Sequence, residues 1–498
     1  MTQVKESAAT HGQGRSQQER YAWRVLSVTS LGVLLTGLNS STLDVGLPSV
    51  SRHFAATPSQ ASWFLLSYML VNTVLILVFG RVADLVGRRT LYVAGLGVFT
   101  AASLGCGLAP NASSLIALRA IQGLGAAAIV TNTTAQIVDA FPRPLVGMAL
   151  GLNVTVMSAA KVAGPVVGGA FVTSLGWRWV FLFNVPVGVI GVTWAILTLR
   201  SSPPADAGAH FDWPGAALSA MWLSGVVLVL TEGSSNGWST PPVIAAGAVA
   251  AIALPTFLVV QARRRHALVD LALFRSRERA MAYIATFLLA AARLALVLLA
   301  SLFLQAVQGL DAFAAGLRVT PLAIGMMVAA PVAGRLATRI PPRILSTFGT
   351  VVVAAGLLTL ALGASPTSSY LLIGSSLFAV GVGTGCFLPP NTSAIMASVG
   401  AQSRGVANGV RSMLQNSGGL TSTAMVLAIV TSPLNPAEKR AAYAGTLSQL
   451  PGHDLSAFIS GYRVALLVLF ALCIVAAAAS VLRGATATPA VSEPALEA

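Results

Sequence analysis

The stretch GRVADLVGRR, Gly80–Arg89, decides the fold of this chain. It places three arginines and one aspartate between two long apolar runs. A weaker copy, GRLATRIPPR, follows another apolar run at Gly334–Arg343. Two related charged loops at corresponding places in the two halves of a chain indicate an internal repeat. The sequence therefore predicts two equivalent bundles of membrane helices, an architecture typical of transporters.

The composition is that of a membrane protein. Of the 498 residues, 55% are hydrophobic and 9% are charged, whereas a soluble chain carries about 25% charged residues. The apolar residues form blocks of about 20, the length at which a helix crosses a bilayer. We therefore expect an all-α membrane protein. Residues 1–23 are polar and predict no cleavable signal peptide.

The apolar blocks predict 14 transmembrane helices, here called spans. They are expected at residues 25–47, 60–79, 91–109, 113–136, 145–172, 179–199, 214–231, 241–261, 281–305, 313–334, 344–363, 369–397, 405–430 and 461–482. The two charged loops follow spans 2 and 10, so spans 1–6 and 9–14 form the two bundles. The expected organisation is an N-terminal tail (1–24), a six-helix bundle (25–200), two inserted helices (201–262), a basic loop (263–280), a second six-helix bundle (281–482) and a C-terminal tail (483–498).

The net charge of +15 is unevenly distributed along the chain. With an even number of spans, most of the 30 lysines and arginines fall on the side of the two termini. Positive residues are retained in the cytoplasm, so both termini are expected to be cytoplasmic. This pattern favours membrane topology over a nucleic-acid partner. The basic loop at 263–280 is expected to lie against anionic lipid headgroups.

The sequence gives no sign of a catalytic or metal site. Cys106, Cys386 and Cys473 lie in apolar blocks without metal or redox spacing. The chain has no zinc-protease, Walker or Ser/His/Asp signature. We therefore expect no enzyme activity, no metal and no cofactor. A transporter without its own ATPase would draw on an ion gradient.

Several motifs occur together along most of the chain. They are GRVADLVGRR after span 2, LIALRAIQGLGAA (Leu115–Ala127) in span 4, and Gly151 with AKVAGPVVGG (Ala160–Gly169) in span 5. These resemble motifs of the major facilitator superfamily, and FDWPGAALS (Phe211–Ser219), EGSSNGW (Glu232–Trp238) and LFLQAVQG (Leu302–Gly309) resemble its fourteen-span drug:proton antiporters. The resemblance covers about residues 25 to 482. It implies the major facilitator fold, with two six-helix bundles plus two inserted helices.

The resemblance implies a cytoplasmic gate at the first loop. The gate residues would be Gly80, Asp84, Arg88 and Arg89. Gly80 allows close helix approach, and in the family the acid at Asp84 helps to hold the gate shut by pairing with arginines and with the start of span 13 near Arg404. Alternatively, the loop is a simple stop-transfer charge cluster. The second loop has Thr338 in place of the acid, so the two loops are not expected to be equivalent.

Asp44 and Arg119 are the candidates for proton coupling. An arginine within span 4 is costly and should face water or a partner, and the family ties this arginine to proton coupling. Alternatively, its side chain extends to the outer interface. Asp44 is the only carboxylate clearly within a span, so it is the best side-chain proton carrier, unless it is merely an interfacial acid. Compared with the family pattern, Asn39 and Asp44 stand in exchanged order.

Span 5 matches the antiporter motif of the family. The matching residues are Gly151, Gly164, Pro165, Gly168 and Gly169. Small residues permit close helix packing, and the proline bends the helix. In the family this bend lies between the halves and limits leakage. Lys161 is unusual in this motif, and it is either a cation that faces the substrate or half of a buried pair.

A polar cavity between the bundles is expected to bind the substrate. Its candidate residues are Asn39, Gln122, Lys161, Arg411 and Gln415. The last two belong to a polar stripe on span 13, and a polar face on a membrane helix normally lines a cavity. Arg293 in span 9 is a further isolated cation, with structural pairing as the expected role. One acid against several membrane cations disfavours dicationic drugs and favours neutral or anionic amphiphiles.

Together these observations predict a monomeric, multi-pass protein of the bacterial cytoplasmic (inner) membrane. It would exchange protons for small drugs or antibiotics and expel them, and so confer multidrug or antibiotic resistance. The bilayer, protons and a small-molecule substrate would be its partners, without nucleic acid. One alternative is an exporter of an endogenous metabolite or siderophore with the same fold. The other is a membrane sensor, which the lack of an appended soluble domain disfavours.

Overall fold

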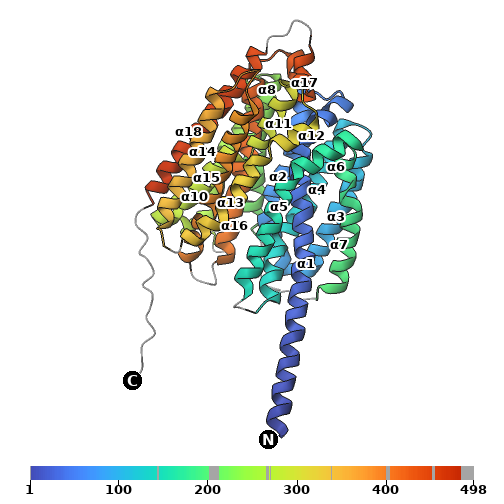
Figure 1. Cartoon of the computed structure of the whole chain (residues 1–498), viewed down its shortest axis with the longest axis vertical. Coiled ribbons are helices and arrows are strands. Elements are labelled where there is room, and N and C mark those ends of the chain that lie inside the picture. The colour runs from blue at the N-terminus through green and yellow to red at the C-terminus, as the bar shows by residue number, and fades with distance from the viewer. Residues whose placement is uncertain are drawn as a thin grey trace.

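A computed structural model describes residues 2–142, 145–200, 212–264, 269, 271–337, 339–399, 404–450 and 455–483. Side chains at 2–17, 77, 81, 84, 147 and 404–406 are outside this description. Within these ranges the chain is helical and contains no strand (Figure 1).

The first half of the chain forms six membrane-length segments. Its helices are α1 (Thr2–His53), α2 (Pro58–Val86), α3 (Arg88–Leu108), α4 (Ala112–Ala140), α5 (Val146–Ser174), α6 (Trp179–Leu182) and α7 (Asn184–Thr198). The short α6 and the longer α7 together make the sixth segment. Much of the expected tail at 1–24 is helical, because α1 already begins at Thr2.

The two inserted helices are α8 (Trp213–Asn236) and α9 (Pro241–Arg263). The second half comprises η2 (Leu271–Phe274), α10 (Arg277–Arg293), α11 (Leu296–Ala306), α12 (Ala312–Arg318), α13 (Thr320–Leu336), α14 (Pro342–Leu362), α15 (Tyr370–Ala397), α16 (Arg404–Thr431), α17 (Pro436–Ala444), η4 (Leu447–Gln449) and α18 (Ser456–Val481). Spans 9 and 10 are each divided into two helices, α10–α11 and α12–α13.

Thirteen helical segments in the described residues are long and apolar enough to cross a membrane. They correspond to thirteen of the expected spans. The remaining expected span, 405–430, is α16, which has 28 residues but carries polar side chains along one face. The expected all-α membrane fold is confirmed. Large apolar residues such as Leu197 and Leu371, each 80% exposed, lie on outward surfaces as lipid contact requires.

Local sequence fixes where several helices begin at the turns. Thr57 caps α2 by accepting a hydrogen bond from the backbone N–H of Gln60, whose side chain bonds back to the N–H of Thr57. Asn111 and Ser114 form the same reciprocal box at the start of α4. Such boxes satisfy amide groups that have no partner within the helix.

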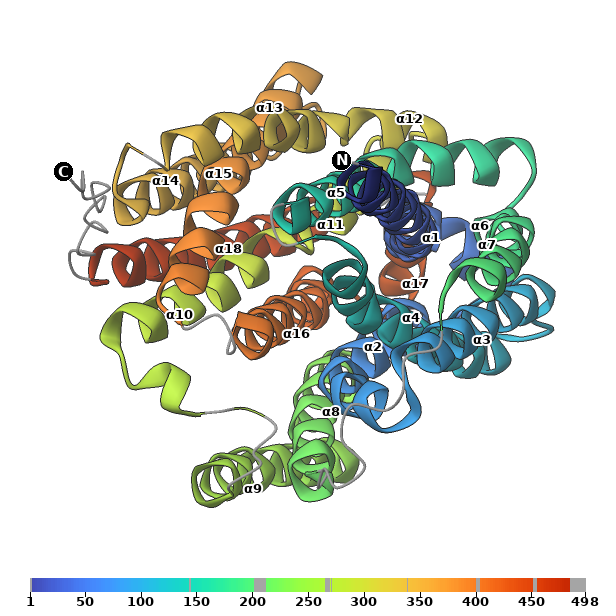
Figure 2. The ribbon, with the colours of Figure 1, turned by 90° about the horizontal axis from the view of Figure 1, so that it is seen from below.

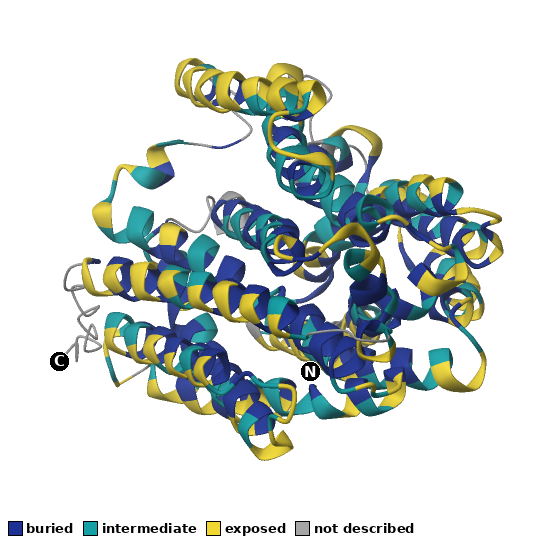
Figure 3. Ribbon diagram, turned by 90° about the horizontal axis from the view of Figure 1, so that it is seen from above, coloured by how far each residue is buried: buried dark blue, intermediate teal, exposed yellow. Residues whose placement is uncertain are grey.

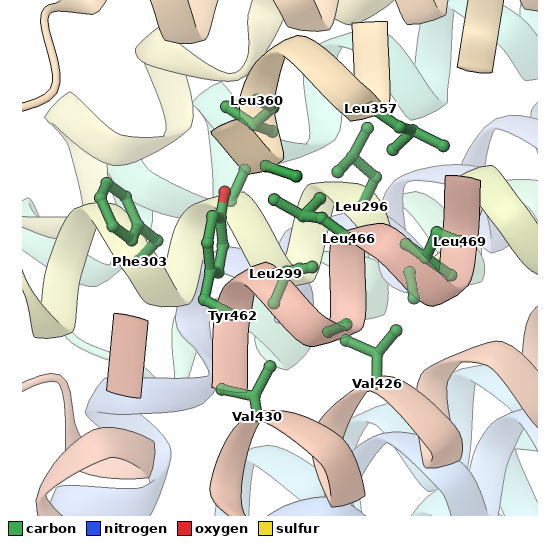
Figure 4. Packing of buried hydrophobic residues seen from close by; sticks show 14 of the residues in the cluster. Leu296, Leu299, Phe303, Leu357, Leu360, Val426, Val430, Tyr462, Leu466 and Leu469 are labelled. Atoms are coloured by element: carbon green, nitrogen blue, oxygen red, sulfur yellow. The ribbon is translucent and has the colours of Figure 1, made fainter. Parts of the chain in front are cut away.

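The start of α1 and the end of α18 lie at the same end of the molecule, which we call the termini end (Figure 1). Helix α17 lies at the opposite end, which we call the far end. Each half has its own apolar core. In the second half, side chains of α11, α14, α16 and α18 pack around Leu299, Tyr462 and Leu466 (Figure 4). Exposed residues line the outer faces of the helices, and buried residues lie between them (Figure 3).

The two halves meet at the far end through an apolar cluster. Leu43, Leu47, Phe64 and Leu65 of the first half pack there with residues of the second. The second-half members are Leu298, Leu302, Leu427 and Tyr443. Helix α8 lies beside both α2 and α16, so it contacts both halves (Figure 2).

Candidate functional site

A cavity of about 2190 Å³ lies between the two halves. Most of its lining residues come from α1, α2, α4 and α5 of the first half and from α10, α13, α15 and α16 of the second. At the termini end its rim includes Gly80, Ala83, Asp139 and Arg275. Because the halves pack together at the far end, the cavity opens toward the termini end.

Asp44 and Lys161 both line the inner part of this cavity, toward the far end, on α1 and α5. Asp44 shares its helix face with Val33, Gly37 and Ser40, which also line the cavity. Asp44 is half-buried, and Lys161 is exposed to the cavity. Arg119 and Lys161 are close enough to Asp44 for their charges to act on it. The structure therefore brings the expected proton carrier together with two membrane cations.

Arg119 is only 1% exposed and has its guanidinium enclosed by polar and aromatic groups. Its Nε donates to the carbonyl oxygen of Phe64 at 3.0 Å, and its Nη1 donates to Oε1 of Gln122 at 2.6 Å. The guanidinium lies over the ring of Tyr68, 4.3 Å from its centroid. Among the described residues, no carboxylate lies within ion-pair distance of Arg119. Hydrogen bonds and ring contacts thus hold this buried charge.

Asn39 and Gln122 were expected to line the cavity, but both are fully buried behind its wall. Nε2 of Gln122 donates to Oδ1 of Asn39 at 3.0 Å and to Oγ of Ser103 at 2.7 Å. Nδ2 of Asn184 also donates to Oδ1 of Asn39, at 3.2 Å. Asn39 lies on the face of α1 that points to α4 and α7, whereas Asp44 lies on the cavity face. This network fixes the position of Arg119.

The polar stripe of α16 lines the cavity at Asn408, Arg411 and Gln415. Nε of Arg411 donates to Oδ1 of Asn408 at 3.0 Å, and its Nη1 donates to Oε1 of Gln415 at 3.0 Å. The stripe therefore holds its own cation in place. This polar face also explains why α16 is less apolar than the other membrane-length helices.

The small residues of α5 make close contacts with two other helices. A Cβ on Gly164 would clash with Ser41, and one on Gly168 would clash with Thr42, so these glycines let α5 approach α1. A Cβ on Gly169 would clash with the backbone of Ala312 in the second half. Gly151, by contrast, has open space around it. Pro165 lies inside α5 and lines the cavity.

The expected gate loop lies at the open end of the cavity. Nη1 of Arg88 is 2.5 Å from Oδ2 of Asp139, and Nη2 of Arg89 donates to the carbonyl oxygen of Ile196 at 2.9 Å. Both partners belong to the first half. A Cβ on Gly80 would find ordinary contact with Thr131 at 3.6 Å, so this conformation does not require glycine there. The side chains of Asp84 and Arg404, and residue Thr338, lie outside the described residues.

Polar contacts that no sequence motif indicated join the halves at the far end. The hydroxyls of Ser62 and Tyr443 lie 2.8 Å apart, and Nη1 of Arg52 donates to the carbonyl oxygen of Ala444 at 2.8 Å. Nε2 of Gln305 donates to the carbonyl oxygen of Val45 at 3.0 Å. Two of these contacts involve α17, which lies between the expected spans 405–430 and 461–482.

The termini end also holds a polar cluster that was not expected. Oδ2 of Asp212 accepts a hydrogen bond from Gln261 at 2.6 Å, and its Oδ1 lies 3.2 Å from Nη1 of Arg264. Asp212 also caps α8 through the N–H of Gly215. The cluster joins the two inserted helices beside the cavity mouth. In the sequence, an aspartate just before the Trp-Pro start of a helix could have indicated the cap.

Comparison with known proteins agrees with this geometry. The chain is 31% identical over 388 residues to the multidrug resistance protein Stp of Mycobacterium tuberculosis, covering 78% of this chain and 72% of Stp. It is 29% identical over 394 residues to the riboflavin transporter RibZ of Clostridioides difficile, covering 79% and 85%. A bacterial homolog of the human lysosomal transporter Spinster, solved in an inward-facing, unoccupied conformation, matches with a TM-score of 0.65 at 17% identity, over 93% of this chain and 97% of that one.

The family model of the Major Facilitator Superfamily matches residues 29–423. The fold of the solved neighbour and the thirteen apolar helices are consistent with this match. The predicted fold and the predicted family are therefore both confirmed. They imply a transporter rather than an enzyme. The chain is a multi-pass membrane protein that belongs to the Major Facilitator Superfamily.

Proposed function

We propose that this protein is a proton-coupled antiporter that expels small amphiphilic molecules across the bacterial cytoplasmic membrane. Under this proposal both termini are cytoplasmic, as the distribution of lysine and arginine favours. The cavity then opens to the cytoplasm, where an exporter collects its cargo. The observation that carries the proposal is that cavity, which both halves line and which holds Asp44 in its inner part.

Alternating access requires that the cavity close at one end before it opens at the other. The contacts at the far end consist of one apolar cluster and a few hydrogen bonds, so they can separate as a unit. At the termini end, Arg88 and Arg89 each bond to a partner in the first half, Asp139 and Ile196. Rocking of the two halves about the middle of the cavity would exchange these two states.

Asp44 is the proposed proton carrier. Within the described membrane helices, it is the acid that lines the inner part of the cavity, and it has no hydrogen-bond partner among the described residues. Such a carboxyl group can take up and release a proton when the cavity faces either side. Arg119 is proposed to act on Asp44 through its fixed positive charge.

The names of two relatives support two kinds of cargo. Multidrug efflux is favoured by the likeness to the multidrug resistance protein Stp. Transport of a single metabolite is the second candidate, favoured by a likeness of similar extent to the riboflavin transporter RibZ. Both candidates use the same cavity and differ in how many compounds it accepts.

Proton flux in everted membrane vesicles tests the proposal. Respiration acidifies the vesicle lumen, and compounds of each charge class are then added outside, at the face that was cytoplasmic. An exchanged compound should dissipate the pH gradient only in vesicles that contain the protein. Asp44→Asn should abolish this response, whereas Glu278→Gln, which neutralises an acid outside the cavity lining, should retain it.

One result would speak against antiport, and another against Asp44 as the proton carrier. In one, no compound of any charge class dissipates the gradient although the purified protein binds some of them. In the other, Asp44→Asn folds normally and still exchanges protons at the original rate, which would exclude Asp44 as the carrier.

A further inference from the structure

We propose that Lys161 and Arg293 form a binding site for an anionic group on the substrate, a carboxylate, sulfonate or phosphate. This inference rests on the proposed function, since it concerns the cargo of the same cavity. It names the substrate class as amphiphiles that carry a negative charge. The site lies in the inner part of the cavity, which both halves line.

The two cations approach the cavity from opposite halves. Lys161 belongs to α5, and Arg293 is the last residue of α10, where span 9 breaks before α11 begins at Leu296. Both side chains line the cavity. They are close enough for the charge of Arg293 to act on Lys161. Two positively charged residues, one from each half, therefore line the same ligand-sized cavity.

The other cations of the inner cavity already have protein partners. Arg119 donates to Gln122, and Arg411 donates to Gln415. Among the described residues, neither Lys161 nor Arg293 has a hydrogen-bond or ion-pair partner for its side chain. At the rim, Arg88 and Arg264 pair with aspartates, while Arg275 is exposed. Lys161 and Arg293 are thus the inner cations with donors available to a ligand.

The charge balance at this depth of the cavity is positive. Asp44 is the one acid there among the described residues, and it also faces Arg119. A single carboxylate cannot balance three cations. Repulsion between Lys161 and Arg293 is offset when an anion lies between them, because each then gains an opposite charge in a partly desolvated site. A dicationic substrate would add to the repulsion instead.

The position of the site also links binding to the motion between the halves. An anion held by Lys161 on one side and by Arg293 on the other would bridge the first and second halves. Bound substrate would then favour closure of the cavity around it. Because Asp44 in its charged form competes with the anion for Lys161, removal of that charge should tighten anion binding.

Binding of three matched probes to the purified full-length protein tests the site. The probes are 2-naphthoate, 2-naphthamide and 2-naphthylmethylammonium, which share one ring system and differ in charge. Isothermal titration in nanodiscs of zwitterionic lipid should show naphthoate binding about tenfold or more tightly than the amide, as one charge-assisted contact gives. The ammonium probe should bind most weakly.

Variants separate the site from general effects. Lys161→Gln and Arg293→Gln should each remove the preference for naphthoate, Lys161→Arg should keep it, and Asp44→Asn should increase it. Arg339→Gln removes an exposed charge outside the cavity lining and should change nothing. If Lys161→Gln does not fold, Arg293→Gln tests the same site from the other half.

Three results would overturn the inference. In the first, the ammonium probe binds more tightly than naphthoate. In the second, Lys161→Gln lowers the affinity for all three probes equally. In the third, both glutamine variants keep the original preference for naphthoate over the amide. Titration needs no gradient, so its outcome is independent of antiport. If naphthoate binds at Lys161 but crosses the membrane together with a proton in the same direction, the anion site stands and the proposed antiport fails.

Discussion

The hydroxyl of Tyr443 on α17 lies 2.8 Å from the hydroxyl of Ser62 on α2, and this contact joins the two halves at the far end. Nearby, Gly445 ends α17 with a left-handed φ of 66° and packs against Pro48 of α1. A short helix of the second half is thus held against two helices of the first. The closed far end depends on this contact as well as on the apolar cluster below it.

Tyr443→Phe should favour opening of the far end. The loss of one buried hydrogen bond between the halves destabilises the closed far end by about 0.5–1.5 kcal/mol. Spin labels at Arg178 and Thr367, exposed far-end residues of the two halves, would report a larger share of long distances. Tyr462→Phe is the control, because Tyr462 lies in the core of the second half. Equal distance distributions for both variants would contradict this role of Tyr443.

Gly169→Ala should also shift the equilibrium toward the far-end-open state. The added Cβ would meet the backbone of Ala312 across the interface between the halves, and such overpacking costs about 1–3 kcal/mol. Gly151→Ala is a matched control on the same helix, because Gly151 has open space around it. The same spin-label distances check the shift. If both alanine variants give the same distance distribution as the parent protein, the contact between Gly169 and Ala312 does not affect the equilibrium between the two states.

Arg119→Lys should destabilise the protein although it keeps the charge. A lysine lacks the planar fork that reaches both the carbonyl of Phe64 and Oε1 of Gln122. Leaving Gln122 without its donor costs about 1–3 kcal/mol, which thermal unfolding in detergent would detect. Arg178→Lys, at an exposed cation over Trp177, should stay within about 0.5 kcal/mol of the parent. Equal stability of the two variants would show that charge alone matters at Arg119.

The sequence predicted the fold well because its strongest signals are long and repeated. Blocks of apolar residues mark the membrane helices, and the paired loops mark the two halves. The expected span at 405–430 illustrates the limit of hydropathy. Its helix α16 carries Asn408, Arg411 and Gln415 toward the cavity, and only their helical spacing indicated this.

Side-chain direction within the site was harder to predict. Of the candidate cavity residues, Lys161, Arg411 and Gln415 line the cavity, whereas Asn39 and Gln122 point away from it into a buried network. A polar residue on a membrane helix satisfies its hydrogen bonds equally well with water or with a neighbouring helix, and the sequence does not say which. Helix α17 was missed although Asn435 and Glu438 form a capping box that its sequence spells out.

The position of α8 has a consequence for how the two halves can separate. At the far end, Oε1 of Glu232 on α8 accepts hydrogen bonds from Ser59 at 2.6 Å and from Trp63 at 3.3 Å, both on α2. Deeper in the membrane, Leu223 and Val227 of α8 pack with Leu66 of α2 and with Leu420 of α16. One seam between the halves is therefore spanned by a third element along much of its length. The opposite seam, where α5 meets α12, lacks such a cover among the described helices. Separation of the halves must therefore break contacts of α8 on one side, whereas on the other side it breaks the direct contacts between α5 and α12.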